Sequence, residues 1–294
     1  MTRVGFIGLG VMGEAMCRNI VRSARYTVNV FDLSQTPVAR LAAEGATAMA
    51  SAAELVEASD TVLLCLPGGA EVEARLYGGE NLLIERFQGG QTLVDMSTSP
   101  PLLMRRIEAD LQARSVRFAD APVARTRQAA LDGTLAIMVG GVEAVFSEIE
   151  PLLATMGRDI IHCGPAGSGQ VVKIMNNMVL FQTVNALAEA VSIAEHAGVD
   201  GSVLFDVMSK SSGDSFALRN HGVKSLLPND YPARAFSVRY AAKDLSYARE
   251  LAEAFGLSAE GAAATARVFD GALAAGDGDF YFPVIRRCIE NGGT

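Results

Sequence analysis

Lys173 is the residue of this chain best suited to proton transfer. It lies in the first turns of a long apolar stretch that predicts a helix, and Asn177 follows one turn later on the same face. Elsewhere the chain mostly uses arginine for positive charge, since its only lysines are Lys173, Lys210, Lys224 and Lys243. A buried ammonium can lose a proton, whereas a guanidinium practically cannot. We therefore predict that Lys173 is a general acid or base whose pKa burial lowers; the alternative is a side chain that reaches from the helix end to solvent.

A helix running between Gly164 and Gly198 must position this lysine. Glycines open the stretch, no further glycine or proline interrupts it, and Gly198 stands where a helix often ends in a left-handed residue. Apolar residues fall on every side, which predicts burial all round. Polar residues recur too often for a membrane span, namely Lys173, Asn176, Asn177, Gln182, Asn185 and Glu189. We expect one long core helix.

A second set of chemically informative residues lies near the amino terminus. The segment 3–7 reads as a buried strand, and a glycine-rich turn and an amphipathic helix follow it. In that context the turn is typical of a loop that holds a pyrophosphate, and it comprises Gly8, Leu9, Gly10, Val11, Met12 and Gly13. The next predicted strand, 27–31, ends in Asp32, which could accept a hydrogen bond from a ribose hydroxyl. The alternative for Asp32 is an ordinary turn residue.

Strands and helices then alternate up to about residue 163. Apolar runs predict strands at 61–66, 92–95, 117–120, 135–139 and 159–162. Thr36 before Pro37 predicts one helix start, and Ser51 with Glu54 predicts another through a capping box. This pattern predicts a doubly wound α/β domain over residues 1–163. The loops after Ile7, Leu66, Asp95 and Asp120 should then meet at the carboxyl edge of one parallel sheet.

The strand signal disappears after Gly164. Apolar residues recur at helical spacing through 203–208, 242–255 and 262–273, so we expect an all-α domain over residues 164–294. The glycines at 167 and 169 open a helix after a strand, but no second βαβ unit follows them. We interpret them as a tight junction between the two domains.

Composition excludes several classes of function. The net charge is −8, which argues against a general nucleic-acid or acidic-membrane surface because such a surface needs a basic face. The four cysteines are far apart without a CxxC pair, and only three histidines are present, so we expect reduced thiols and no metal site. The amino-terminal apolar run ends in glycines and lacks a signal-peptide cleavage pattern. We therefore expect a cytoplasmic protein that acts on small molecules.

Four segments in the same order resemble the β-hydroxyacid dehydrogenases. They are FIGLGVMGEAM at 6–16, DAPV at 120–123, GSGQVVKIMNN at 167–177 and KDL at 243–245. The resemblance implies a Rossmann domain, a helical domain joined to it by the long helix, dimers or tetramers formed through the helical domain, and reversible oxidation of a small 3-hydroxy acid. Residue by residue, it implies that Lys173 is the catalytic lysine and that Asn177 and Asp244 hold substrate. It also implies cofactor contacts from Thr98 and Lys243, with the Thr98 hydroxyl near the substrate as well. From the loop after the strand 61–66 we expect further cofactor contacts, by Leu66 and Pro67.

One segment departs from the family pattern. Family members usually continue DAPV with Ser-Gly-Gly, which holds the substrate carboxylate, whereas here Val123 is followed by Ala124, Arg125 and Thr126. We expect this loop, 123–126, to line the substrate site, and we predict that Arg125 binds the carboxylate through its planar fork. The alternative is a solvated arginine.

The nicotinamide cofactor should be NAD, with NADP the weaker alternative. Asp32 would repel a 2′-phosphate, and Leu33 stands where NADP-preferring relatives often carry arginine. Three other hypotheses stay open. Histidine catalysis could involve His162, His196 or His221; the chain could be an imine-reductase-like enzyme, although many of those replace the lysine; or it could be a nucleotide-binding module without activity.

Overall fold

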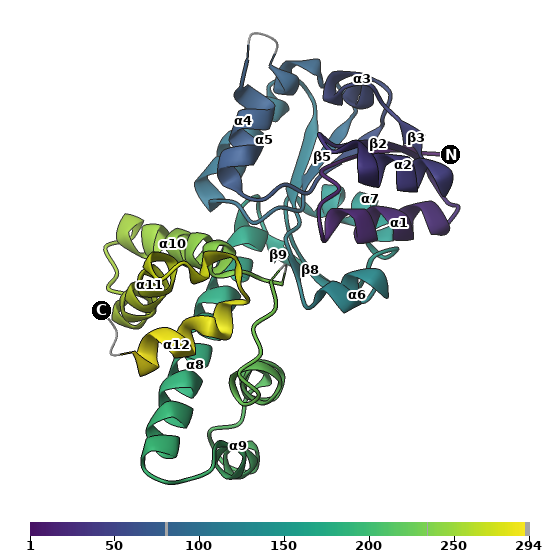
Figure 1. The fold of residues 1–294 in the computed structure, drawn as a ribbon. Coiled ribbons are helices and arrows are strands. Elements are labelled where there is room, and N and C mark those ends of the chain that lie inside the picture. Colours follow the sequence, from purple (N-terminus) through teal and green to yellow (C-terminus); the bar gives the residue numbers. More distant parts are fainter. Residues whose placement is uncertain (80–81, 234, 292–294) are drawn as a thin grey trace. The chain divides into compact units, whose positions relative to one another are not determined.

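The computed structural model describes residues 1–79, 82–233 and 235–291. The chain divides into two compact units, Met1–Lys173 and Ile174–Thr294. Helix α8 (Ser168–His196) begins in the first unit and continues in the second (Figure 1). The division therefore falls inside this helix, later than the boundary after residue 163 that the end of the strand signal predicts. The two units are described one at a time.

The first unit is built on a nine-stranded sheet in the order β3-β2-β1-β4-β5-β6-β8-β7, with β9 paired to β8. Strands β1 to β6 form parallel pairs, and β8 runs antiparallel to β6 and β7. This confirms the predicted doubly wound sheet. The strands are β1 (Arg3–Ile7), β2 (Thr27–Phe31), β3 (Thr47–Ala48), β4 (Thr61–Leu64), β5 (Thr92–Asp95), β6 (Arg117–Asp120), β7 (Val123–Ala124), β8 (Leu135–Gly140) and β9 (Gly157–Gly164).

Helices cover both faces of this sheet, which explains its continuous apolar strands. Within β1, Phe6 packs in the cluster that includes residues of α1 (Gly13–Arg22), α2 (Gln35–Ala43) and α7 (Glu143–Leu153). Its neighbour Ile7 packs in the opposite cluster, with α3 (Ala52–Glu57), α4 (Gly69–Tyr77) and α5 (Pro101–Gln112). Successive side chains of a strand point to opposite faces, so both need apolar partners.

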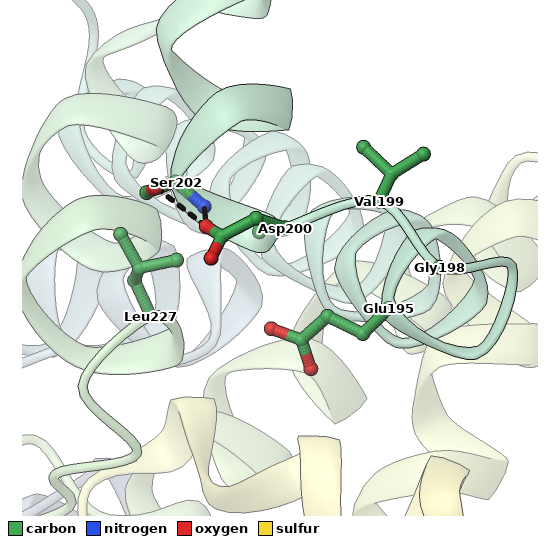
Figure 2. Close-up of a pocket in the computed structure, with 7 residues that line it drawn as sticks. Glu195, Gly198, Val199, Asp200, Ser202 and Leu227 are labelled. Atoms are coloured by element: carbon green, nitrogen blue, oxygen red, sulfur yellow. Dashed lines mark hydrogen bonds between the residues drawn. The ribbon is translucent and has the colours of Figure 1, made fainter.

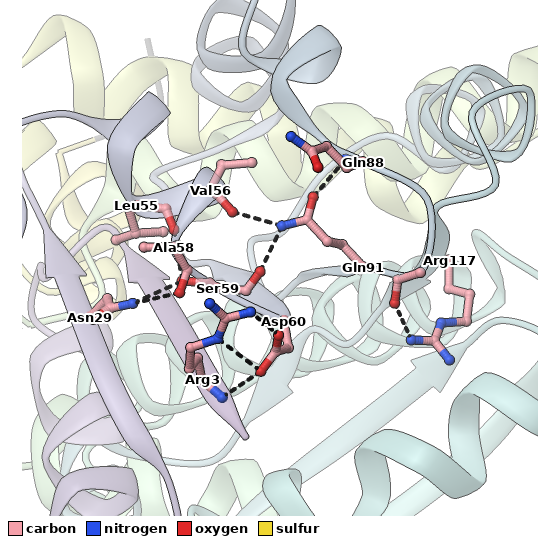
Figure 3. Close-up of polar contacts among 11 residues, drawn as sticks. Arg3, Asn29, Leu55, Val56, Ala58, Ser59, Asp60, Gln88, Gln91 and Arg117 are labelled. Atoms are coloured by element: carbon pink, nitrogen blue, oxygen red, sulfur yellow. Dashed lines mark hydrogen bonds and ion pairs between the residues drawn. The ribbon is translucent and has the colours of Figure 1, made fainter. Parts of the chain in front are cut away.

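The two edges of the parallel sheet have different roles. Register pairs Ile7 with Leu64, Leu64 with Asp95 and Asp95 with Asp120, so the loops after these strands start at one edge, as predicted. At the other edge, polar contacts tie the strand starts to neighbouring turns (Figure 3). The Arg3 amide donates to Asp60 at 2.8 Å, and the Gln91 side-chain amide donates to the carbonyls of Val56 and Ser59. These contacts fix the amino ends of the strands to the turns beside them.

The second unit is helical, as predicted. Besides α8 it contains α9 (Gly201–Ser209), a π-helix (Leu218–Leu226), α10 (Val238–Ala254), α11 (Glu260–Ala274) and α12 (Ile285–Glu290). Phe181 of α8 lies at the centre of its core, with edge-to-face contacts to Phe269 and Phe282 at centroid distances of 5.6 and 5.3 Å. No helix among the described residues is long and apolar enough to cross a membrane.

Two local predictions need correction. Helix α8 is not buried all round, because Val179 and Ile193 are 59% and 69% exposed on one face. Helix α2 begins at Gln35 after Ser34, so Thr36 is not its N-cap. The capping box at Ser51 is confirmed, since the Glu54 amide donates to the Ser51 hydroxyl at 3.1 Å. The short elements β3, β7 and α6 (Arg127–Leu131) were not predicted.

Candidate active site

The glycine-rich turn after β1 has the shape required to hold a pyrophosphate. Gly8 has φ +98°, and a Cβ there would lie 2.3 Å from the Cys65 carbonyl oxygen. A Cβ on Gly13 would lie 2.0 Å from the Gly8 carbonyl oxygen, so close packing inside the protein requires both glycines. Gly10 differs, because a Cβ there would meet no atom within 4 Å. The open space at Gly10 and the start of α1, which has no side-chain cap, fit a phosphate group that approaches the backbone.

Asp32 lies beside this turn, as the motif predicts. One carboxylate oxygen accepts from the Leu9 amide at 2.6 Å, and the other accepts from the Ser34 amide at 2.7 Å. The two amides hold the carboxylate at the glycine turn. Leu33 is 79% exposed and presents no positive charge there.

Hydrogen bonds join the loops that follow β4 and β5. The Leu66 amide donates to the Ser97 hydroxyl at 2.9 Å, and the Ser97 amide donates to Asp95 at 3.0 Å. Asp95 and Ser97 are buried. The network therefore fixes the backbone next to Pro67 and Thr98, which are among the predicted cofactor contacts.

The start of α8 is attached to the same edge of the sheet through Asp120. This buried carboxylate accepts from the amides of Gly167 and Gln170 at 2.6 and 2.8 Å. Burial raises the pKa of Asp120 to about 7, while the two backbone hydrogen bonds act in the opposite direction. Lys173, half-buried, follows Gln170 by one turn. Sequence reasoning assigned no role to Asp120 or Gln170, although an acid that closes a buried strand was a usable signal.

The loop 123–126 is held by contacts within the first unit. Val123 and Ala124 pair with β8, and the Thr126 hydroxyl accepts from the Ala129 amide at the start of α6. Arg125 has φ +88°, the left-handed conformation that glycine adopts most easily. Its guanidinium donates to the Thr134 carbonyl at 2.6 Å and pairs with Asp159. The fork predicted for a substrate carboxylate therefore already holds a carboxylate of the protein.

The second unit brings Asn177, Lys243 and Asp244 together. The Asn177 side-chain amide of α8 donates to Asp244 of α10 at 2.8 Å, and both residues are buried. The Lys243 ammonium lies 2.9 Å from the other Asp244 oxygen and 5.2 Å from the centre of the Tyr247 ring. This ion pair offsets the charge of the buried carboxylate. The oxygen thus has a charged partner, although the contact does not meet hydrogen-bond geometry.

The three histidines occupy structural positions. Both ring nitrogens of His162 have partners, Glu143 at 2.9 Å and the Gly141 carbonyl at 2.7 Å, and the ring stacks on Phe146. His196 contacts the Ser192 carbonyl. His221 contacts the Tyr281 hydroxyl at 2.6 Å, and burial lowers its pKa to about 4. These contacts favour lysine over histidine as the proton-transfer group.

A pocket of about 650 Å³ lies in the second unit at the turn between α8 and α9 (Figure 2). None of the predicted site residues lines it. Its carboxylates are engaged, since Glu195 pairs with Arg286 and Asp200 accepts from the Ser202 amide at 2.7 Å. Within the described ranges, no group of three or more His, Cys, Asp or Glu residues could hold a metal ion.

Comparison with known proteins places these features in a family. Residues 3–164 match the NAD binding domain of 6-phosphogluconate dehydrogenase, and residues 167–282 match the NAD-binding domain of NADP-dependent 3-hydroxyisobutyrate dehydrogenase. Two Pseudomonas aeruginosa proteins, an NAD-dependent L-serine dehydrogenase and a 3-hydroxyisobutyrate dehydrogenase, are 38% and 39% identical over 260 residues, 86% of either chain. The structure of Mycobacterium tuberculosis 3-hydroxyisobutyrate dehydrogenase with L-serine has a TM-score of 0.89 and 33% identity, covering 98% of this chain and 99% of that one.

Proposed function

The chain belongs to the β-hydroxyacid dehydrogenase family, which includes the 3-hydroxyisobutyrate dehydrogenases, and from that premise we propose that it is an NAD-preferring enzyme that oxidises a small 3-hydroxy acid and reduces the matching semialdehyde. The observation that carries the proposal is the position of Lys173. It follows by one turn the start of α8, which Asp120 holds at the carboxyl edge of the sheet. The glycine turn and Asp32 lie at that same edge.

The proposed chemistry divides between cofactor and protein. A nicotinamide supplies the hydride acceptor for oxidation and the hydride donor for reduction. Neutral Lys173 takes the hydroxyl proton as hydride leaves the carbinol carbon, and the ammonium returns the proton in the reverse direction. Asn177 orients the substrate, and the Thr98 hydroxyl lies near both substrate and cofactor. Lys243 and Asp244 contact cofactor and substrate respectively, as the family motif implies.

Asp32 supports the preference for NAD. Its carboxylate, held at the glycine turn by the Leu9 amide, suits a ribose hydroxyl donor and opposes a 2′-phosphate. Leu33 cannot supply the positive charge that a phosphate needs. The residues present thus fit NAD, with NADP as the weaker substrate.

The substrate class follows from the relatives and from loop 123–126. The relatives named above act on L-serine and 3-hydroxyisobutyrate, both short acids with a hydroxyl on the third carbon. We propose a substrate of this class, with its carboxylate bound at Val123, Ala124, Arg125 and Thr126. Ala124 has no hydroxyl to offer, so the carboxylate must bind to the other groups of the loop. Arg125 can bind it only by exchanging Asp159 for the substrate.

Initial rates with a panel of 3-hydroxy acids and semialdehydes, measured with both cofactors, test the function directly. For the chemistry, Lys173→Ala should lower kcat by roughly 100-fold to 10,000-fold, the usual effect of removing a positioned acid or base, while NAD still binds. Lys173→Arg keeps the charge but supplies no free base at neutral pH. Near-normal oxidation by the arginine variant would rule out the role of Lys173.

We also propose that the protein is a homodimer or homotetramer formed through its helical unit. Along α8, Val179, Ala186 and Ile193 recur every seven residues on one exposed face, where Glu189 is the neighbouring charged residue. This spacing is typical of a seam that packs against another helix. Light scattering at micromolar protein measures the mass, and a monomer at that concentration would contradict the proposal.

A further inference from the structure

Thr98 lies between Ser97 and Ser99, and hydrogen bonds to Gln170 and Asp95 hold both of these neighbours in place. On one side, the Ser97 carbonyl accepts from the side-chain amide of Gln170 at 2.8 Å. On the other, the Ser99 amide donates to the side-chain oxygen of Gln170 at 3.0 Å. Asp95 accepts hydrogen bonds from the Ser97 amide and the Ser99 hydroxyl, both at 3.0 Å. The two neighbours of Thr98 are therefore held by four hydrogen bonds, two of them to one glutamine side chain.

Gln170 belongs to the helix that carries Lys173. Its backbone amide donates to Asp120 at 2.8 Å, so main chain and side chain both bind to strand ends of the sheet. A Cβ on Gly169 would lie 2.8 Å from an Asp120 oxygen, and one on Gly140 would lie 2.4 Å from the other oxygen. The close approach of α8 to the sheet therefore depends on glycine at both positions. Lys173 lies three residues later, about 4.5 Å along the helix axis and on the same side.

We propose that Gln170 is a positioning residue that fixes Thr98 relative to Lys173 and thereby sets the geometry of hydride and proton transfer. The inference rests on the roles proposed above for those two residues. The place needs a neutral side chain that can do both, because it must accept from the Ser99 amide and donate to the Ser97 carbonyl at once. Gln170 is fully buried, so water cannot replace either bond if the side chain is changed.

The first test is Gln170→Met, which keeps the approximate volume and removes both hydrogen bonds. A displacement of reacting groups by about 1 Å can lower a rate by roughly 100-fold. We therefore expect kcat to fall by roughly 10-fold to 100-fold, while the KM of the hydroxy acid and the Kd of NADH change less than about threefold. With the acid deuterated at the carbinol carbon, the isotope effect on kcat should rise towards its intrinsic value as chemistry becomes slower. Gln182→Met, on the same helix, is the matched control and should leave kcat unchanged.

The second test is Gln170→Glu, and it still decides the question if the methionine variant does not fold. A protonated carboxyl can donate to Ser97 and accept from Ser99 as the amide does, and burial favours that neutral form. A carboxylate cannot donate. The kcat of Gln170→Glu, divided by that of the wild type, should therefore rise as the pH falls.

Two results would overturn the positioning role. One is a folded methionine variant with wild-type kcat and isotope effect, and the other is a Gln170→Glu ratio that stays near one at every pH. Both of these results are measured in Gln170 variants, while the wild-type enzyme remains active. Failure of the proposed function would instead appear in the wild type, as the absence of turnover with every 3-hydroxy acid and semialdehyde.

Discussion

Arg125 and Asp159 offer a test of the carboxylate site in which two variants should change KM in opposite directions. If the guanidinium of Arg125 binds the substrate carboxylate, Arg125→Ala removes a charged hydrogen bond worth roughly 1.5 to 3 kcal/mol. That loss corresponds to a KM for the acid about 10 to 100 times higher. Alanine keeps the left-handed backbone strain at φ +88°, so the comparison isolates the side chain.

The Asp159→Asn variant should act in the other direction. In the structure Asp159 holds the guanidinium that the substrate would need, and the two side chains are 37% and 44% exposed. A pair this exposed contributes about 0 to 1 kcal/mol. Removing the competing charge should therefore lower the KM of the acid, by at most about fivefold. Arg125→Lys should recover part of the affinity, because a point charge lacks the bidentate geometry.

Steady-state kinetics at saturating NAD measure these effects, with the KM of NAD as an internal control. Arg127→Ala, two residues away and exposed, is the matched variant and should leave both constants unchanged. If Asp159→Asn raised the KM of the acid as Arg125→Ala does, the pair would brace the loop and not bind substrate. An unchanged KM in Arg125→Ala would move the carboxylate to the backbone amides of loop 123–126 or to Thr126.

Two further predictions concern cofactor choice and stability. Asp32→Ser combined with Leu33→Arg should shift the ratio of kcat/KM values towards NADP, because repulsion of the 2′-phosphate is replaced by attraction; an unchanged ratio would contradict the role of Asp32. Burial lowers the pKa of His221 from 6.5 to about 4. Between these two pH values the imidazole is therefore mostly protonated in the unfolded chain and mostly neutral in the folded one. Relative to His221→Gln, the wild type should lose at most about 3 kcal/mol of unfolding free energy as the pH falls from 6.5 to 4, which urea denaturation measures. Parallel pH curves for the two proteins would contradict that account.

The amino-acid sequence was sufficient to predict several buried strands and the motifs attached to them. The predicted bounds of β1, β2, β5 and β6 agree with the structure. These strands are short apolar runs buried on both faces, so the chain itself records where burial begins and ends. The glycine turn and Asp32 follow for a similar reason, because turn, helix start and acid are neighbours of those strands.

Only the tertiary structure decided how the polar groups at the sheet edge are paired. Asp120 binds amides 47 and 50 residues later, Gln170 binds a loop more than seventy residues earlier, and Arg125 pairs with Asp159 across 34 residues. A buried polar group must find a partner, but its sequence does not say which one. The short strands β3 and β7 were missed for the same reason, since two residues become a strand only when a distant strand pairs with them. The local pattern of apolar residues indicates which segments are buried. Which polar groups and strands pair depends on the distant segments that the fold brings into contact.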